Sequence, residues 1–323
     1  MEDLRAFCAS LNNRSVGVIG VGISNRPVID FLLRHGARVT ARDRRDPAAA
    51  KELIGQLRAR DVACRFGEDY LENITESLLL KSPGVRPDLP QLQKAVDNGA
   101  VLSSEMELFL RFCPCPVFAV TGSDGKTTTT TLTSLFLRAA AENTPRRVFL
   151  GGNIGTPLLP QIEAITKEDF VAAELSSFQL EKVSSFCPDI AVVLNLTPDH
   201  LERHHTMEAY GEAKKNIFRQ QGEAQVTVLN YDDPIVRTWG AETKGRLCYF
   251  SRKEKLQQGI YMKYGDFIIS WDGKQESVCN ISELHLFGGH NEENVLAAIA
   301  CGFFAGVSIS DMADVLHNFR SIE

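Results

Sequence analysis

Short β-branched runs and helical patterns alternate along almost the whole chain, and this alternation restricts the fold more than any other feature. SVGVIG (15–20) is typical of a strand, an expected helix follows from about Asn25 to His35, and ARVTARD (37–43) is typical of the next strand. Two further expected strands, SLLLKSPG (77–84) and AVLSSE (100–105), are separated by the polar helix PQLQKAVDNG. Strands joined through helices pair in parallel, so the first hundred residues predict a Rossmann-like parallel-sheet domain of the α/β class.

A second α/β series follows a linker. FCPCP (112–116) is rich in proline, lacks periodicity and stands directly before a fresh strand, so we expect a boundary near Arg111 and two domains, 1–111 and 112–323. From 259 to 286 the pattern changes to polar alternating strands with a WDGK turn, which predicts a small antiparallel β extension, and two helices close the chain. The other strands expected in the second domain are PVFAVTG, RVFLGGNIG, EDFVAAELSSF, DIAVVLNLTPDH, AQVTVLN and GRLCYFS.

The composition favours a protein that binds small ligands in a reducing compartment. A length of 323 residues with 44% hydrophobic residues suffices for two domains, each with a core. The net charge of -6 argues against nucleic acid and acidic membrane surfaces as partners. No apolar run has the length of a signal peptide or a membrane span, so we expect a cytoplasmic protein. The eight cysteines are scattered, and the pair in CPC (113–115) lacks the C-x-x-C spacing of zinc or redox sites.

The stretch TGSDGKTTTT (121–130) predicts a phosphate-binding loop that runs into a helix. It departs from the pattern G-x-x-x-x-G-K-[ST] because Val120 stands where the first glycine belongs, and a plain turn before a threonine-rich helix is the alternative. In a P-loop-type ATPase domain the loop amides would wrap a phosphate, Lys126 would meet the outer phosphates and Thr127 would hold Mg²⁺. The later threonines are expected to pack in the helix or to lie on its surface: Thr129, Thr130, Thr131 and Thr133.

Polar side chains stand at the expected carboxyl ends of the following strands, which is the edge where open α/β sheets bind ligands. Beside a phosphate loop, a carboxylate and an imidazole suit Mg²⁺ ions that offset nucleotide charge, although Glu174 alone could be a cap and His200 alone a core histidine. Further along, His290 and Asn294 begin a helix and could either cap it or face an adenine edge. The strand-end set comprises Asn153, Glu174, Ser176, Gln179, Asn195, Asp199 and His200.

Two other patterns support weaker hypotheses. GVGISN (20–25), with Asp43 at the end of the next strand, has the arrangement of a dinucleotide site. Asn25 replaces the third glycine, which favours another nucleotide or diphosphate over NAD and leaves a turn without a ligand as an alternative. The histidines of HLERHH (200–205) suggest zinc, but no cysteine or acidic partner completes a tetrahedral set.

Taken in order, TGSDGKTT, GGNIG, ELSSFQL, NLTPDHLERH, AYGEAKKNIF and GGHNEENVLAA resemble the bacterial Mur ligases, and the resemblance covers nearly all the chain from about residue 15. ELSSFQL and SPGV (82–85) are most similar to the D-glutamate-adding members, with the L-alanine-adding members as the alternative. The resemblance implies that ATP and Mg²⁺ are used to convert the carboxylate of UDP-N-acetylmuramoyl-L-alanine into an acyl phosphate, which D-glutamate attacks during peptidoglycan precursor synthesis. Such chemistry needs charge neutralisation and positioning more than a covalent nucleophile. We also expect a monomer.

The resemblance implies roles for individual residues. Lys126 would contact the outer phosphates, and Thr127 with Glu174 would hold the first Mg²⁺. His200 would hold the second Mg²⁺ together with Lys214, which matches the family's carbamylated lysine. Carbon dioxide adds only to a neutral amine, so this role requires a depressed lysine pKa. The implied ATP site is Gly122, Ser123, Asp124, Gly125, Lys126, Thr127, Thr128, His290 and Asn294. The implied UDP-substrate site is Ile23, Ser24, Asp43, Arg44 and Gly84 in the first domain, with Asn153, Ser176 and Gln179 in the second.

Two departures from the family pattern lead to further expectations. Asp124 stands where asparagine is common, so it would weaken ATP binding unless its side chain turns outward. The chain ends at HNFRSIE (317–323), where family members continue into a third domain of on the order of 100–150 residues, so we expect a fragment that does not complete ligation. Outside the family, the alternatives are a nicotinamide-dependent dehydrogenase and a non-catalytic module that binds UDP-muramoyl peptide.

Overall fold

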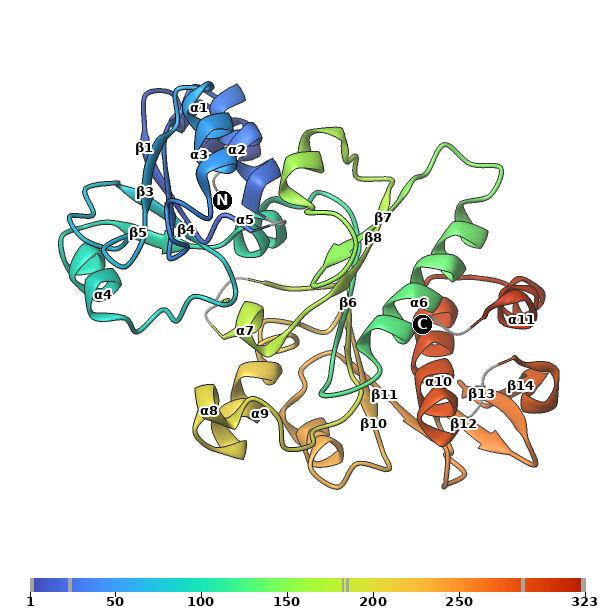
Figure 1. Cartoon of the computed structure of the whole chain (residues 1–323). Coiled ribbons are helices and arrows are strands. Elements are labelled where there is room, and N and C mark those ends of the chain that lie inside the picture. Colours follow the sequence, from blue (N-terminus) through green and yellow to red (C-terminus); the bar gives the residue numbers. More distant parts are fainter. Residues whose placement is uncertain (1–2, 23–24, 182, 184–185, 286–287, 321–323) are drawn as a thin grey trace. The chain divides into compact units, whose positions relative to one another are not determined.

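The computed structural model describes residues 3–22, 25–181, 183, 186–285 and 288–320. The chain divides into two compact units, Met1–Cys113 with Thr156–Ala164 and Pro114–Gly155 with Ile165–Glu323 (Figure 1). The sequence placed 156–164 in the second domain, whereas this short segment packs with the first unit. The Glu105 carboxylate is the reason at the atomic level, because it accepts the amide hydrogens of Leu158 and Leu159 at 2.9 and 2.8 Å.

The first unit is a parallel sheet with helical connections. Its strands lie in the order β3-β2-β1-β4-β5, and every neighbouring pair is parallel. The strands are β1 (Ser15–Ile19), β2 (Arg38–Asp43), β3 (Ala63–Phe66), β4 (Leu78–Lys81) and β5 (Val101–Ser103). The helices are α1 (Leu4–Ser10), α2 (Asn25–Arg34), α3 (Lys51–Arg58), α4 (Pro90–Asp97), α5 (Glu105–Phe112) and the 3₁₀ segment η1 (Leu159–Ala164). The Rossmann-like prediction is confirmed, because apolar β1 and β4 form the buried centre of the sheet.

The second unit is a nine-stranded mixed sheet with the order β14-β13-β12-β11-β10-β9-β6-β8-β7. Its strands run parallel from β7 to β12, and only the β12–β13 and β13–β14 pairs are antiparallel, so the predicted antiparallel extension is confirmed. The strands are β6 (Val117–Thr121), β7 (Val148–Gly152), β8 (Phe170–Glu174), β9 (Ile190–Val193), β10 (Val226–Asn230), β11 (Arg246–Ser251), β12 (Gly259–Lys263), β13 (Asp266–Trp271) and β14 (Lys274–Asn280).

Helices of this unit pack on the sheet and on one another. Helix α6 lies beside α10 and α11 (Figure 1). Leu132 and Phe136 of α6 are fully buried in the shared core. The helices are α6 (Lys126–Ala141), α7 (Ser177–Leu180), α8 (Leu201–His204), α9 (Met207–Lys215), α10 (Gly289–Phe304) and α11 (Ile309–Asn318), with 3₁₀ segments η2 (Val236–Glu242) and η3 (Ile281–Glu283).

The register of the central strands brings distant parts of the sequence to one edge. Strand β6 lies between β8 and β9, with Val120 opposite Glu174 and Thr121 opposite Val193. Strand β7 ends at the same level, because Gly152 lies opposite Glu174. The segments that follow these four strands therefore leave the sheet together at its carboxyl edge, which is where parallel sheets hold their ligands.

Candidate functional site

The loop between β6 and α6 has the backbone geometry of an anion site. Gly125 is the N-cap residue of α6 at φ 81°, a left-handed conformation that favours glycine, and a Cβ added there would overlap Oδ1 of Asn294. The first amides of α6 have no carbonyl partner within the helix, and together with the helix dipole they attract a phosphate. The loop therefore has both the close packing and the free donors that phosphate binding requires.

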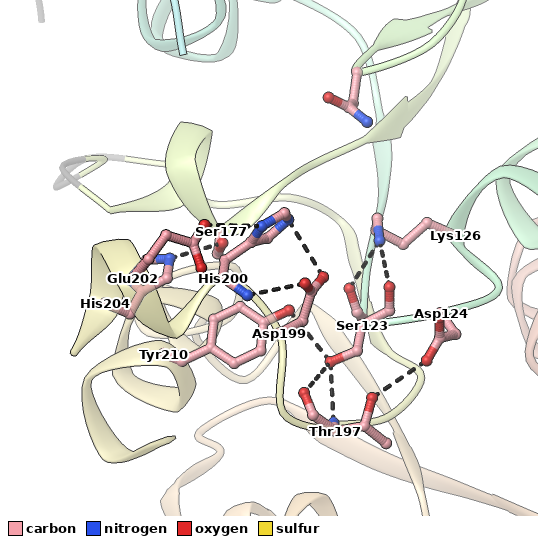
Figure 2. Close-up of polar contacts among 12 residues, drawn as sticks. Ser123, Asp124, Lys126, Ser177, Thr197, Asp199, His200, Glu202, His204 and Tyr210 are labelled. Carbon is pink, nitrogen blue, oxygen red and sulfur yellow. Dashed lines mark hydrogen bonds and ion pairs between the residues drawn. The ribbon is translucent and has the colours of Figure 1, made fainter. Parts of the chain in front are cut away.

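Lys126 is hydrogen-bonded to the backbone of this loop, and the Ser123 hydroxyl joins the loop to Thr197 and Tyr210 (Figure 2). Lys126 Nζ donates to the carbonyls of Gly122 and Ser123 at 3.0 and 2.8 Å. Ser123 Oγ donates to the Thr197 carbonyl at 3.0 Å, accepts from the Thr197 amide at 3.0 Å and lies 3.2 Å from Oη of Tyr210. The loop is thus tied to the segment after β9, and the Lys126 ammonium lies over it.

Asp124, which departs from the family pattern, points toward the segment after β9. Its carboxylate accepts a hydrogen bond from Thr197 Oγ1 at 3.2 Å, and the residue is exposed (Figure 2). The hydrogen-bond partner of the Asp124 carboxylate is a neutral hydroxyl. Because the residue is exposed, solvent screens its negative charge.

Glu174 lies at the end of β8 as a buried carboxylate. It is 1% exposed, Thr127 Oγ1 donates to one of its oxygens at 2.9 Å, and Asn153 Nδ2 donates to the other at 2.8 Å. Within the described ranges, no lysine, arginine or histidine forms an ion pair with Glu174. A buried carboxylate with only neutral partners fits a divalent cation, and a hydroxyl with a carboxylate is an oxygen set that suits Mg²⁺.

Protein side chains alone would not complete such a site. Among the residues that the structure describes, no group of three His, Cys, Asp or Glu side chains is placed to hold a metal ion. Mg²⁺ usually keeps several waters and takes further oxygens from bound phosphates, so two protein ligands beside a phosphate loop fit this ion.

Lys214 is buried beside the loop although its side chain is cationic in water. It is 1% exposed, Nζ donates to the Gly122 carbonyl at 2.7 Å, and the ammonium lies 4.5 Å from the centre of the Tyr210 ring. Burial, and after it the nearby Lys126 ammonium, lower the pKa of Lys214 to about 7, against the attraction of Asp199 and Asp124. Near neutral pH a large fraction of this amine is therefore unprotonated and nucleophilic.

His200 is the N-cap residue of α8 and is half-exposed. Its Nε2 lies 3.3 Å from Asp199 and its Nδ1 lies 3.8 Å from Glu202 (Figure 2). The centre of its ring is 4.8 Å from that of Phe178. His204 is instead buried, and its Nε2 is 2.9 Å from the Ser177 hydroxyl. Of these two histidines, His200 is thus the one that is open to a ligand.

Two other predicted residues of the second unit take part in local capping. Ser176 and Gln179 form the capping box of α7, in which Gln179 Oε1 accepts the Ser176 amide at 2.9 Å and the Ser176 hydroxyl accepts the Gln179 amide at 3.3 Å.

Asn294 is 3% exposed and lies against the loop, with Oδ1 3.4 Å from the Thr129 hydroxyl, whereas His290 is exposed at the start of the same helix.

The first unit holds a separate set of predicted residues. Asp43 accepts the Val21 amide at 2.7 Å and Arg45 Nε at 2.8 Å; burial alone would raise its pKa, but these hydrogen bonds and the guanidinium charge lower it. Arg44 and Gly84 are exposed. Ile23 and Ser24 lie outside the described residues.

The sequence did not single out the residues that support the loop. Asn195 was expected only as one of several strand-end side chains, and Thr197 and Tyr210 were not selected. Tyr210 stands four residues before Lys214, so both lie on one face of α9, and this spacing is the signal that would have found it.

Comparison with known proteins decides the family. The model of the Mur ligase middle domain matches residues 120–302. This chain belongs to the Mur ligase family. A second model, the Mur ligase MurD-like N-terminal domain, matches residues 14–103 of this Mur ligase. The alternative of a nicotinamide-dependent dehydrogenase is therefore without support.

Curated relatives match along the whole of this Mur ligase. UDP-N-acetylmuramoylalanine–D-glutamate ligase of Clostridium kluyveri is 42% identical over 323 residues, which is 100% of this chain and 68% of the relative. The protein of the same name from Clostridium tetani gives the same values. That of Acetivibrio thermocellus is 44% identical over 299 residues, 92% of this chain and 63% of the relative. The chain thus spans about two thirds of the length of these relatives.

Solved structures agree in fold. The UDP-N-acetylmuramate:L-alanyl-gamma-D-glutamyl-meso-diaminopimelate ligase of Neisseria meningitides superposes with a TM-score of 0.65 at 19% identity, covering 96% of this chain and 99% of that one. The UDP-N-acetylmuramate-alanine ligase of Thermotoga maritima gives a TM-score of 0.58 at 22% identity, covering 95% and 69%. At these identities the likeness shows the fold alone.

Proposed function

We propose that this Mur ligase serves the ATP-dependent ligation of D-glutamate to UDP-N-acetylmuramoyl-L-alanine. The relatives that match its whole length carry the name of that ligase. The structural observation that carries the proposal is the phosphate loop with the buried Glu174 carboxylate beside it, which forms no ion pair with a Lys, Arg or His side chain in the described part of the chain. The reaction class is amide-bond formation through an acyl phosphate, in which the protein positions the reactants and stabilises charge.

The nucleotide would lie on the loop Gly122–Thr128 and the adenine would face Asn294. Lys126 has its ammonium over the loop, from which it can turn toward the outer phosphates while α6 stays in place. Thr127 and Glu174 would hold one Mg²⁺. Bound Mg²⁺ supplies neutralisation of the phosphate charge. Asn153 then keeps the Glu174 carboxylate oriented.

Lys214 and His200 would serve a second cation. The neutral Nζ of Lys214 attacks the carbon of CO₂, a nitrogen–carbon bond forms, and the proton lost from nitrogen passes to water, which leaves an anionic carbamate on a buried stem. The depressed pKa of Lys214 supports this reaction because it keeps the amine unprotonated. The exposed ring of His200 supports its role as the other ligand of this second cation.

The remaining substrate contacts are proposed from the resemblance. Asp43, Arg44 and Gly84 would hold the uridine diphosphate end, and Asn153, Ser176 and Gln179 would border the muramoyl group. We also propose a cytoplasmic monomer. Within the described residues, none of the helices has the length and apolar character needed to span a bilayer.

Calorimetric titration tests this function. We expect UDP-N-acetylmuramoyl-L-alanine to bind more tightly than UDP-N-acetylmuramate, which separates the D-glutamate-adding from the L-alanine-adding reaction. We expect Glu174→Gln to weaken Mg-ATP binding at least about tenfold, since it removes the anionic ligand. The exposed Glu223 of the same unit provides the matched control, Glu223→Gln, which should bind Mg-ATP as the wild type does. Equal binding of Mg-ATP by both variants would contradict the assignment of Glu174.

A further inference from the structure

The side chain of Asn195 contacts the phosphate loop at three points. Its Oδ1 accepts the amide hydrogens of Ser123 and Asp124, both at 2.9 Å. Its Nδ2 donates to the Asp124 carbonyl at 3.2 Å. The Asn195 carbonyl also accepts from the Ser123 amide, at 3.2 Å. One side chain at the end of β9 therefore satisfies two donors and one acceptor of a loop that begins 73 positions earlier, at Gly122.

These contacts divide the loop amides into two groups. Those of Ser123 and Asp124 are bound to Asn195, whereas the amides of the first turn of α6, beginning at Lys126, have no partner inside the helix. A carbonyl oxygen that accepts two adjacent amides fixes their direction, and a loop of four residues has little freedom once two of its peptide groups are fixed. The unbound amides are consequently held in one orientation before any ligand arrives.

Asn195 and Asn294 contact different parts of the loop, near Gly122 and Gly125 respectively. A Cβ added at Gly122 would meet Leu194 Cβ at 2.9 Å and Asn195 Oδ1 at 3.4 Å, and one added at Gly125 would overlap the Asn294 amide. The loop backbone is thus in close contact with two asparagine side chains. They differ in function: Asn195 hydrogen-bonds the loop backbone, whereas Asn294 lies against Gly125 and is 3.4 Å from the Thr129 hydroxyl.

We propose that Asn195 is a positioning residue whose side-chain amide holds the 122–125 loop in its phosphate-binding conformation. The consequence for nucleotide affinity rests on the proposed function, whereas the consequence for loop order does not. Without the Asn195 side chain, the amide and carbonyl of Asp124 turn to water and the Ser123 amide keeps only its bond to the Asn195 carbonyl at 3.2 Å. The loop then has to be ordered at the moment a nucleotide binds, which weakens binding.

The first measurement is hydrogen exchange of the peptide 120–128 in the protein without nucleotide. We expect Asn195→Ala to raise exchange at Ser123 and Asp124. The matched control is Asn216→Ala, because Asn216 also donates its side-chain amide to one backbone carbonyl, that of Leu180 at 2.9 Å, but does not touch the loop. This control should leave exchange in 120–128 unchanged. Unchanged exchange in Asn195→Ala would overturn the proposal.

The second measurement is the dissociation constant for Mg-ADP and Mg-ATP by titration. We expect Asn195→Ala to raise both at least about tenfold, and Asn216→Ala to change neither. Asn195→Asp keeps an oxygen that accepts both amides, so it should retain the exchange protection while its added charge weakens ATP binding more than ADP binding. Loss of protection with unchanged affinity would overturn the positioning role. If the wild type bound no nucleotide, the proposed function would fail, and the exchange experiment would still decide whether Asn195 holds the loop.

Discussion

Two adjacent lysines of α9 have opposite environments. Lys214 is buried against Gly122 and Tyr210, and burial lowers its pKa to about 7. Lys215 forms ion pairs with Glu212 at 2.9 Å and Glu242 at 2.6 Å, which outweigh partial burial and raise its pKa. The same residue type is thus a candidate nucleophile at one position and a surface cation at the next, because successive side chains of a helix point about 100° apart and so lie on different faces.

The burial of Lys214 predicts how stability depends on pH. Its pKa is about 7 in the folded protein, against 10.5 for an ordinary lysine, so between these pH values the unfolded chain binds more protons. The free energy of unfolding must therefore rise with pH across this window, by up to about 1.4 kcal/mol per pH unit, and stay flat below it. We expect Lys214→Met to lose this rise in urea titrations from about pH 7 to about pH 9 in buffer free of carbon dioxide.

Lys215→Met is the matched control for this prediction. The pKa of Lys215 is raised, so its stabilising effect is present below the ordinary lysine value and is lost only above it. Its variant should therefore follow the wild-type slope between neutral pH and pH 9. Parallel curves for the wild type and Lys214→Met would contradict the burial of a neutral amine.

At the level of single residues, the sequence predicted the types of side chain in the site better than their contacts. Thr127 and Glu174 were expected near one another, and the structure joins them at 2.9 Å. The residues around Lys214 did not indicate that it is buried, since adjacent lysines are normally solvated. Only the resemblance to the Mur ligases implied a depressed pKa at this position. Asp124 was expected to disturb phosphate binding unless it turned outward, and its contact with Thr197 arises from a segment more than seventy residues away.

Among the elements, the connection between β6 and α6 tolerates an added side chain poorly. Gly125 has φ 81°, and an added Cβ would overlap Asn294, so Gly125→Ala combines backbone strain with displacement of a buried side chain. Gly273, in the turn between β13 and β14, has φ 76° with open space around it. The substitution Gly273→Ala therefore measures the cost of the backbone conformation alone.

We expect Gly273→Ala to lower the free energy of unfolding by about 1 kcal/mol. Gly125→Ala should lower it by about 2 kcal/mol more, and it should weaken nucleotide binding at least about tenfold. Urea denaturation and nucleotide titration of both variants measure these effects. Equal losses of stability in the two variants would show that Asn294 moves aside at little cost.

Elements were predictable where their sequence is strongly apolar or helically periodic. Strands β1, β4, β6 and β8 are buried runs that the sequence shows directly. Strand β3 was missed because ACRF is half-exposed, short and carries an arginine. Pairing with β2, rather than the strand propensity of its own residues, stabilises it. Segment 156–164 was assigned to the wrong unit, since its partner Glu105 lies some fifty positions away.

On the scale of the whole molecule, each unit has its own core. Ile19, Leu79 and Leu92 are fully buried in the first, and the apolar faces of α6 and α10 close the second. Two units with separate cores are expected to unfold as separate cooperative transitions. Both tryptophans of the chain, Trp239 and Trp271, belong to the second unit, so tryptophan fluorescence reports its unfolding alone.

This placement makes the two proposed ligand sites separable in one experiment. We expect Mg-ATP to raise the urea midpoint seen by fluorescence, whereas uridine diphosphate, the end of the substrate assigned to the first unit, should raise the part of the circular dichroism transition that fluorescence does not follow. At a hundredfold excess over the dissociation constant, each ligand stabilises the unit that binds it by about 2.7 kcal/mol. Lys126→Ala should remove the first shift and preserve the second, because Lys126 lies in the loop of the second unit. Coincident transitions that both ligands shift equally would contradict separate sites on separately folding units.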